Sequence, residues 1–76
     1  MKEININDSI FQLVTTYPEI KDILFSLGFT DIVKPGMLQT AGRIMTLSKG
    51  SKAKGISLEI IKKAFHTEGF NIKELS

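Results

Sequence analysis

Apolar residues recur at helical spacing in the first third of the chain. Four of them share one helical face: Ile10, Leu13, Val14 and Tyr17. This i, i+3, i+4, i+7 pattern predicts an amphipathic helix. Ser9 and Gln12 form a capping-box pattern, which predicts that the helix begins at Ile10. Pro18 disfavours helical geometry in the residue before it, so the helix is predicted to end there.

A second helix is predicted directly after this corner, because proline suits the first position of a helix. Its apolar face is formed by Ile20, Ile23, Leu24 and Leu27. Glycine accepts the left-handed conformation that closes a helix, which predicts an end at Gly28. Phe29 is then placed to fold back on Leu24 in a Schellman motif.

The middle of the chain is dominated by turn-forming residues. Residues 30–36 contain Pro35-Gly36 and are predicted to form a loop, and a short helical stretch is predicted near 37–43. Thr46 and Gly55 then bracket a predicted helix over Leu47–Lys54. Gly50 lies on its inward face, where a small residue allows a neighbouring element to approach closely.

The last helix is predicted to begin after Ser57. Its apolar face is formed by Leu58, Ile61, Ala64 and Phe65, widened by Ile60. Gly69-Phe70 repeats the glycine-aromatic ending of the second helix, with Phe70 reaching back to Phe65. The residues from Asn71 to Ser76 are predicted to fray.

Alternation of apolar and polar residues, the mark of a half-buried strand, is confined to Ile4 and Ile6. The predicted fold class is therefore all-α: a compact orthogonal bundle of four to five short helices. It forms a single domain over residues 1–76, with an ordered core at about residues 4–70.

The composition removes most routes to catalysis. The 76 residues contain no Cys and one His, which excludes disulfides, thiolate nucleophiles and cysteine-ligated metals. His66 is expected on the surface, and the stretch Ser48–Lys52 lacks the first glycine of a phosphate-binding loop. We therefore expect no enzyme activity, no catalytic or metal-binding residues and no cofactor. Uncharged stretches are too short for a membrane span, and the start does not resemble a secretory signal, so a cytoplasmic location is expected.

Charge is divided unevenly along the chain. Residues 1–33 sum to −3 and the remainder to +5. The stretch between Asp31 and Glu59 contains no acid, and its candidate anion or nucleic-acid contacts are Arg43, Lys49, Lys52 and Lys54. Two interpretations stay open: the basic segment binds an external anion, or the acidic half docks on the basic half.

The two helices around Gly55 also have the outline of a helix-turn-helix. Two features oppose DNA binding. Lys54 takes the place of an apolar residue before the turn glycine, and the second helix opens with Leu58-Glu59 rather than with strong base-reading residues.

An ordered set of residues carries a family resemblance. It comprises Ser9-Ile10, Leu13-Val14, Tyr17-Pro18-Glu19, Ile23-Leu24, Leu27-Gly28-Phe29, Gly42-Arg43, Met45-Thr46-Leu47, Gly50-Ser51-Lys52, Gly55-Ile56 and Gly69-Phe70. The set, roughly from Ile4 to Phe70, resembles the small family numbered 1858 among domains of unknown function. The resemblance implies a helical bacterial domain, found alone or before haemerythrin-like and PAS sensor domains.

A related branch of this family is similar to the N-terminal domain of iron–sulfur repair proteins. That branch carries cysteines just after the position of Gly28, where this chain has Phe29-Thr30-Asp31-Ile32. This chain therefore falls in a cysteine-free branch, and the resemblance carries over no thiol or metal role.

Two aromatic residues lie about 100° off the apolar faces of their helices, namely Phe11 and Phe25. They are the candidate protein contacts. The sequence thus favours a non-enzymatic interaction module that self-associates or docks on a sensor-type partner protein, and a core this small gains from a homodimer. The alternative is a helix-turn-helix-like module that binds nucleic acid or an anion through the basic 43–54 segment.

Overall fold

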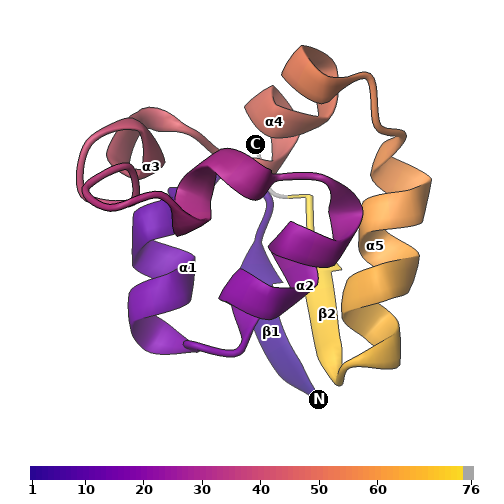
Figure 1. Cartoon of the computed structure of the whole chain (residues 1–76). Helices are drawn as coiled ribbons and strands as arrows, with labels where there is room; N and C mark the ends of the chain where they lie inside the picture. The colour runs from indigo at the N-terminus through magenta and orange to yellow at the C-terminus, as the bar shows by residue number, and fades with distance from the viewer. Residues whose placement is uncertain (75–76) are drawn as a thin grey trace.

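The chain folds into five α-helices, one 3-10 turn and two short strands over residues 1–74, which the computed structural model describes, with the backbone alone at Val33 (Figure 1). In chain order the elements are β1 (Lys2–Asn5), α1 (Ile10–Thr16), α2 (Ile20–Leu27), the 3-10 turn η1 (Thr30–Val33), α3 (Ala41–Ile44), α4 (Leu47–Lys54), α5 (Leu58–Thr67) and β2 (Phe70–Lys73).

The first two helices follow the predicted signals closely. The Ser9 hydroxyl accepts from the Gln12 N–H at 3.0 Å, which confirms the cap of α1. The start of α2 lies later than predicted, because residues 17–20 first form a turn in which the Ile20 N–H donates to the Tyr17 carbonyl. At the other end Gly28 has φ +108°, and the Phe29 N–H donates to the Leu24 carbonyl at 3.0 Å, which confirms the Schellman motif.

The later helices α4 and α5 are also confirmed. Gly55 closes α4 with φ +67°, and the Ile56 N–H donates to the Ser51 carbonyl at 3.0 Å. Gly50 lies directly beneath the ring of Phe29, so the close approach predicted for this glycine is made by the segment that follows α2. The short helix of the middle segment, α3, is displaced towards the C-terminus of its predicted range.

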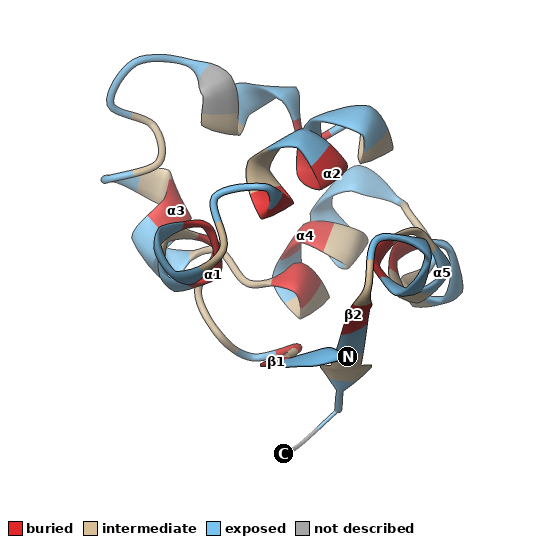
Figure 2. Cartoon of the chain, turned by 90° about the horizontal axis from the view of Figure 1, so that it is seen from below, coloured by how far each residue is buried: buried red, intermediate tan, exposed pale blue. Residues whose placement is uncertain are grey.

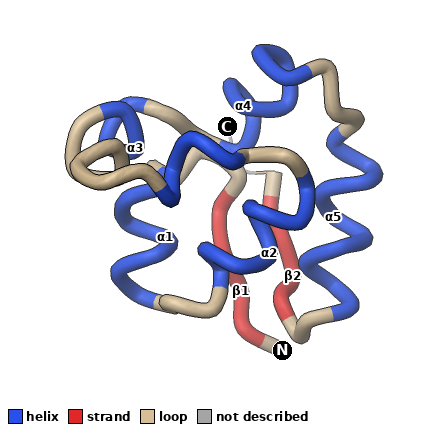
Figure 3. Tube along the Cα trace, in the orientation of Figure 1, coloured by secondary structure: helices blue, strands red, loops and turns tan. Residues whose placement is uncertain are grey.

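The predicted all-α fold class is wrong in one respect, because β1 and β2 pair as a two-stranded parallel sheet (Figure 3). Lys2 is opposite Phe70 and Ile4 is opposite Ile72. The predicted fraying of Asn71 to Lys73 is likewise corrected, while Leu75 and Ser76 lie outside the described residues. Each strand has four residues, which is too short to show a period by itself, and its partner is at the other end of the chain.

The sheet separates apolar from polar side chains, and the helices lie on one side of it (Figure 2). Ile4 and Phe70 are buried on the helix side. On the opposite face the Lys73 ammonium lies 2.9 Å from the Glu3 carboxylate, which lowers the pKa of Glu3. Alternation of this kind in Phe70-Asn71-Ile72-Lys73 is the strand signal that the helical interpretation missed.

Phe70 joins the sheet to the helical core. Its ring packs edge-to-face on Phe65, with centroids 6.0 Å apart, and on Tyr17, with centroids 5.2 Å apart. The predicted contact with Phe65 is therefore confirmed. The backbone ending differs, because the Gly69 N–H donates to the His66 carbonyl and Phe70 continues into β2. The largest fully buried side chains are Phe65, Phe70, Ile10, Ile20, Leu24, Leu47 and Ile61.

None of the helices within residues 1–74 has the length and apolar character required to cross a membrane.

Candidate functional site

The start of α1 and the end of α3 are held in close contact. Gly42 is buried, and a Cβ added to it would lie 3.6 Å from the Phe11 backbone nitrogen and 3.1 Å from Leu38 Cδ1. Next to this contact the Ile10 N–H donates to the Met45 carbonyl at 2.8 Å. The position of the residue between them, Arg43, is therefore fixed relative to α1 by packing and by a backbone hydrogen bond.

This packing stacks Arg43 on Phe11. The guanidinium carbon of Arg43 lies 4.4 Å from the centre of the Phe11 ring, which is cation–π geometry. Phe11 is half-buried and Arg43 is exposed. A guanidinium that rests on a ring keeps N–H donors at its edge, and Arg43 forms no ion pair with any described residue. The residue is thus positioned by the fold and still able to donate.

A hollow of about 410 Å³ surrounds this stacked pair. Its lining comes from α1, its cap and α3: Ser9, Phe11, Gln12, Thr15, Thr16 and Arg43. Arg43 is the only charged residue in this lining, since no acid or base occurs from Ser9 to Pro18. Ile44, which follows Arg43, is 73% exposed. These lining residues together with Ile44 are called the Phe11–Arg43 face below.

The candidate residues of the sequence are thus brought together in part. Phe11, a candidate protein contact, and Arg43, a candidate anion contact, meet in one site. The other candidate protein contact, Phe25, is 49% exposed on α2 and does not line this hollow. Sequence reasoning missed Gly42 and Ile44, and the only signal for Gly42 was a glycine inside a short helical segment.

The three candidate lysines are dispersed. The Lys49 ammonium donates to the Ile44 carbonyl at 3.3 Å. The Lys54 ammonium lies 3.6 Å from the Asp31 carboxylate, whereas Lys52 forms no ion pair with a described residue. Asp31 also pairs with Lys34 at 3.3 Å; Lys34 first, and then Lys54, lowers the pKa of Asp31. One of the candidate cations is thereby used inside the fold.

Ion pairs also link the two oppositely charged parts of the chain. Asp31 to Lys54 and Glu3 to Lys73 both join an acid of the first 33 residues to a base of the remainder. Within the first part, Lys2 hydrogen bonds to Glu19 at 2.9 Å and lowers the pKa of Glu19. These contacts favour the internal interpretation of the charge asymmetry.

The helix-turn-helix outline is present in α4, the turn at Gly55 and α5. The Ser51 hydroxyl donates to the Ile56 carbonyl across the turn and fixes it. Ser57 caps α5 by accepting from the Glu59 N–H at 3.1 Å. Glu59 is exposed in the first turn of α5, where a negative charge opposes the approach of phosphates.

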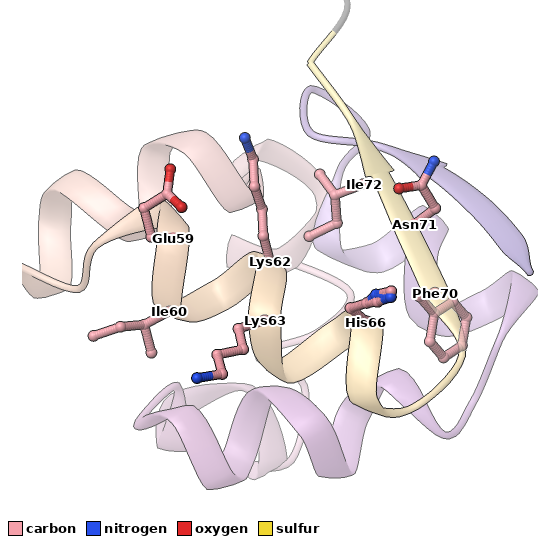
Figure 4. Close-up of a pocket in the computed structure, with 8 residues that line it drawn as sticks. All are labelled: Glu59, Ile60, Lys62, Lys63, His66, Phe70, Asn71 and Ile72. Carbon is pink, nitrogen blue, oxygen red and sulfur yellow. The ribbon is translucent and has the colours of Figure 1, made fainter.

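A second open hollow, of about 480 Å³, lies between α5 and β2 (Figure 4). Cationic and acidic side chains both line it, and Ile60 is 56% exposed beside it. Its Lys62 forms an ion pair with Glu74. His66 is exposed here, as expected for a surface histidine. Within residues 1–74 no group of three His, Asp or Glu side chains is placed to hold a metal ion.

Comparison with known proteins places the chain in a family. The family model described as "Domain of unknown function (DUF1858)" matches residues 4–62. The chain belongs to this family. The DUF1858 match runs from β1 into α5 and stops before β2. It includes both Phe11 and Arg43.

Among solved structures, the DUF1858 chain is similar to the crystal structure of a conserved domain protein from Streptococcus pneumoniae TIGR4. The two are 29% identical with a TM-score of 0.91, over 100% of this chain and 96% of the other. The similarity extends through β2, so the parallel sheet belongs to the shared fold. No curated protein matches the sequence.

Proposed function

We propose that this DUF1858 domain is a non-enzymatic interaction module that binds a partner protein through the Phe11–Arg43 face. The observation that carries the proposal is the stacking of Arg43 on Phe11 at 4.4 Å. Arginine and aromatic residues are enriched at protein interfaces and dominate their binding energy. Here one of each is held together on an exposed surface.

Preorganisation strengthens this proposal. Ordering a flexible side chain at an interface costs about 0.5–1.5 kcal/mol. Gly42 and the bond from Ile10 to Met45 hold the backbone of Arg43 in place, and the ring of Phe11 supports its side chain. Most of that ordering cost is therefore met in the folded chain before a partner arrives.

Nucleic acid is the alternative ligand that the basic segment suggested. Affinity for DNA rises with the number of phosphates that a protein neutralises. Lys54 is already paired with Asp31 and Lys49 is turned to a backbone carbonyl, so the candidate set does not act as one cluster. These contacts favour a protein partner.

The proposal is tested by position-specific photo-crosslinking in cells. A photoreactive amino acid replaces Thr15, which lines the hollow on α1, or Thr67, an exposed residue of α5. The two helices lie on opposite sides of the molecule in both views (Figures 1 and 2). We expect a discrete protein adduct from position 15 that position 67 does not give. No adduct, equal adducts at both positions, or a nucleic-acid adduct would contradict the proposal.

The mass of the adduct also identifies the kind of partner. An adduct of twice the chain mass means that a second copy occupies the face, which is the homodimer that the sequence favoured. A larger adduct identified by mass spectrometry means a different protein, such as the sensor-type partner that the family resemblance implies.

A further inference from the structure

We infer that the Phe11–Arg43 face recognises a carboxylate, carried with neighbouring apolar residues on an acidic segment of the partner protein. The inference rests on the proposed function and goes beyond it by assigning the chemistry of the bound group. The feature that carries it is a guanidinium whose face rests on a ring and whose charge is unpaired within residues 1–74.

The guanidinium has the geometry that carboxylates require. Its N–H donors form a planar fork that meets the two oxygens of a carboxylate in parallel, and the Phe11 ring limits how far that plane can turn. Burial of the ring on one side also removes water from one face of the charge. A charge-assisted hydrogen bond at such a site is stronger than one to a freely moving lysine.

The surroundings of Arg43 select for a single negative group. The rest of the hollow is lined by uncharged side chains, three hydroxyls and one amide among them. Thr15 and Gln12 are exposed and supply polar contacts beside the arginine. No acidic residue occurs between Asp31 and Glu59, so nothing near Arg43 in the sequence repels a carboxylate.

An apolar contact lies beside this cationic one. Ile44 is 73% exposed and directly follows Arg43. Its position is fixed by the Lys49 ammonium, which donates to the Ile44 carbonyl. A complementary ligand therefore carries an acidic side chain next to an aliphatic one, as an acidic and leucine-rich protein segment does.

Phosphate is the other anion that an arginine binds, and nucleic acid is its polymeric source. A duplex presents many phosphates and rewards several cations at once. Within the hollow there is one cation. The single stacked arginine beside an apolar residue is complementary to a protein carboxylate rather than to a phosphate chain.

The test is a titration of the ¹⁵N-labelled protein, followed by NMR, with three probes at equal ionic strength. The first is a blocked peptide of alternating leucine and glutamate, the second is its glutamine counterpart, and the third is a random DNA duplex. We expect the glutamate peptide to shift the Arg43 Nε–H and the amides of α1. Its affinity should exceed that of the glutamine peptide about ten- to a hundredfold, as one charge-assisted contact contributes.

Three variants separate the carboxylate contact from a general charge effect. Arg43→Gln should remove the preference for the glutamate peptide, and Arg43→Lys should reduce it, because lysine keeps the charge and loses the fork. Lys63→Gln makes the same charge change on α5 and should leave the preference unchanged. The Ile72 amide, remote in β2, reports whether each variant is still folded.

The outcomes distinguish this inference from the proposed function. Equal binding of the two peptides, or no binding while the Thr15 adduct persists, overturns carboxylate recognition and leaves protein docking in place. Loss of the glutamate preference in Lys63→Gln as well overturns it in favour of net charge. Stronger binding of the DNA duplex at this face overturns both.

Discussion

Replacement of Gly50 by alanine tests how the middle of the chain is packed. A Cβ at this position would lie 2.4 Å from Cε1 and 3.1 Å from Cζ of Phe29. Carbon atoms in ordinary contact are about 3.5–4.0 Å apart, so the ring would have to withdraw by about 1 Å or more. Phe29 is 4% exposed, and its ring has little room to move.

Two effects of opposite sign decide the magnitude. Alanine is favoured over glycine inside a helix by about 1 kcal/mol. Overpacking of a filled core costs about 1–3 kcal/mol. The clash with the buried ring is severe, so we expect Gly50→Ala to lower the free energy of unfolding by about 1 kcal/mol or more. In a domain of this size that is a fall in Tm of about 4–8 °C.

Urea unfolding followed by circular dichroism measures this change. Lys52→Ala, in the same helix and exposed, is the matched control and should alter stability by less than about 0.5 kcal/mol. A double-mutant cycle with Phe29→Leu isolates the contact. Shortening the ring should make Gly50→Ala neutral or stabilising. If Gly50→Ala stabilises the protein that retains Phe29, the packing described for Gly50 is wrong.

Three further predictions follow from single contacts. Gly28→Ala and Gly69→Ala should each cost about 1–2 kcal/mol in thermal unfolding, because both glycines have positive φ; stabilisation by both would refute the left-handed helix endings. The lowered pKa of Asp31 stabilises the fold above the carboxyl's ordinary value of 3.8, and this stabilisation is lost as the pH falls through the folded pKa. The stability of Asp31→Asn should therefore fall below that of the wild type at neutral pH and meet it in acid, and a constant difference would contradict this. The Ile6 N–H donates to a β2 carbonyl at 2.8 Å, so its hydrogen exchange should be slow, and exchange at the rate of an open chain would exclude the parallel sheet.

Local signals predicted the helices well because each helix is specified by residues within its own turn. Ser9 and Thr46 cap their helices through a hydroxyl and an amide three residues on. Gly28 closes α2 by its own backbone freedom. Such contacts are encoded in a few neighbouring positions, so sequence reasoning reached them directly.

The sheet could not be reached in the same way, because the evidence for each strand is in the other. Ile4 alternates with polar neighbours over only four residues, and Ile72 does so at the far end of the chain. A lone strand has no stable pairing, and parallel strands are joined by long connections. The chain between them is the whole helical domain.

The candidate site was predicted in its parts and not as a whole. Phe11 was singled out for its place beside the apolar face, and Arg43 for its charge. Their juxtaposition depends on Gly42, which lets α3 approach the backbone of α1 at Phe11. That approach is a tertiary contact between segments far apart in sequence, and no local pattern specifies it.

The most direct test of the central claim compares two variants of equal charge in the crosslinking experiment at position 15. Arg43→Gln removes the stacked cation, and Lys63→Gln removes an exposed cation on α5. We predict that Arg43→Gln reduces the yield of the protein adduct about tenfold or more, as loss of one charged contact implies, and that Lys63→Gln leaves it unchanged. Equal yields from both variants would contradict the assignment of the Phe11–Arg43 face as the docking surface.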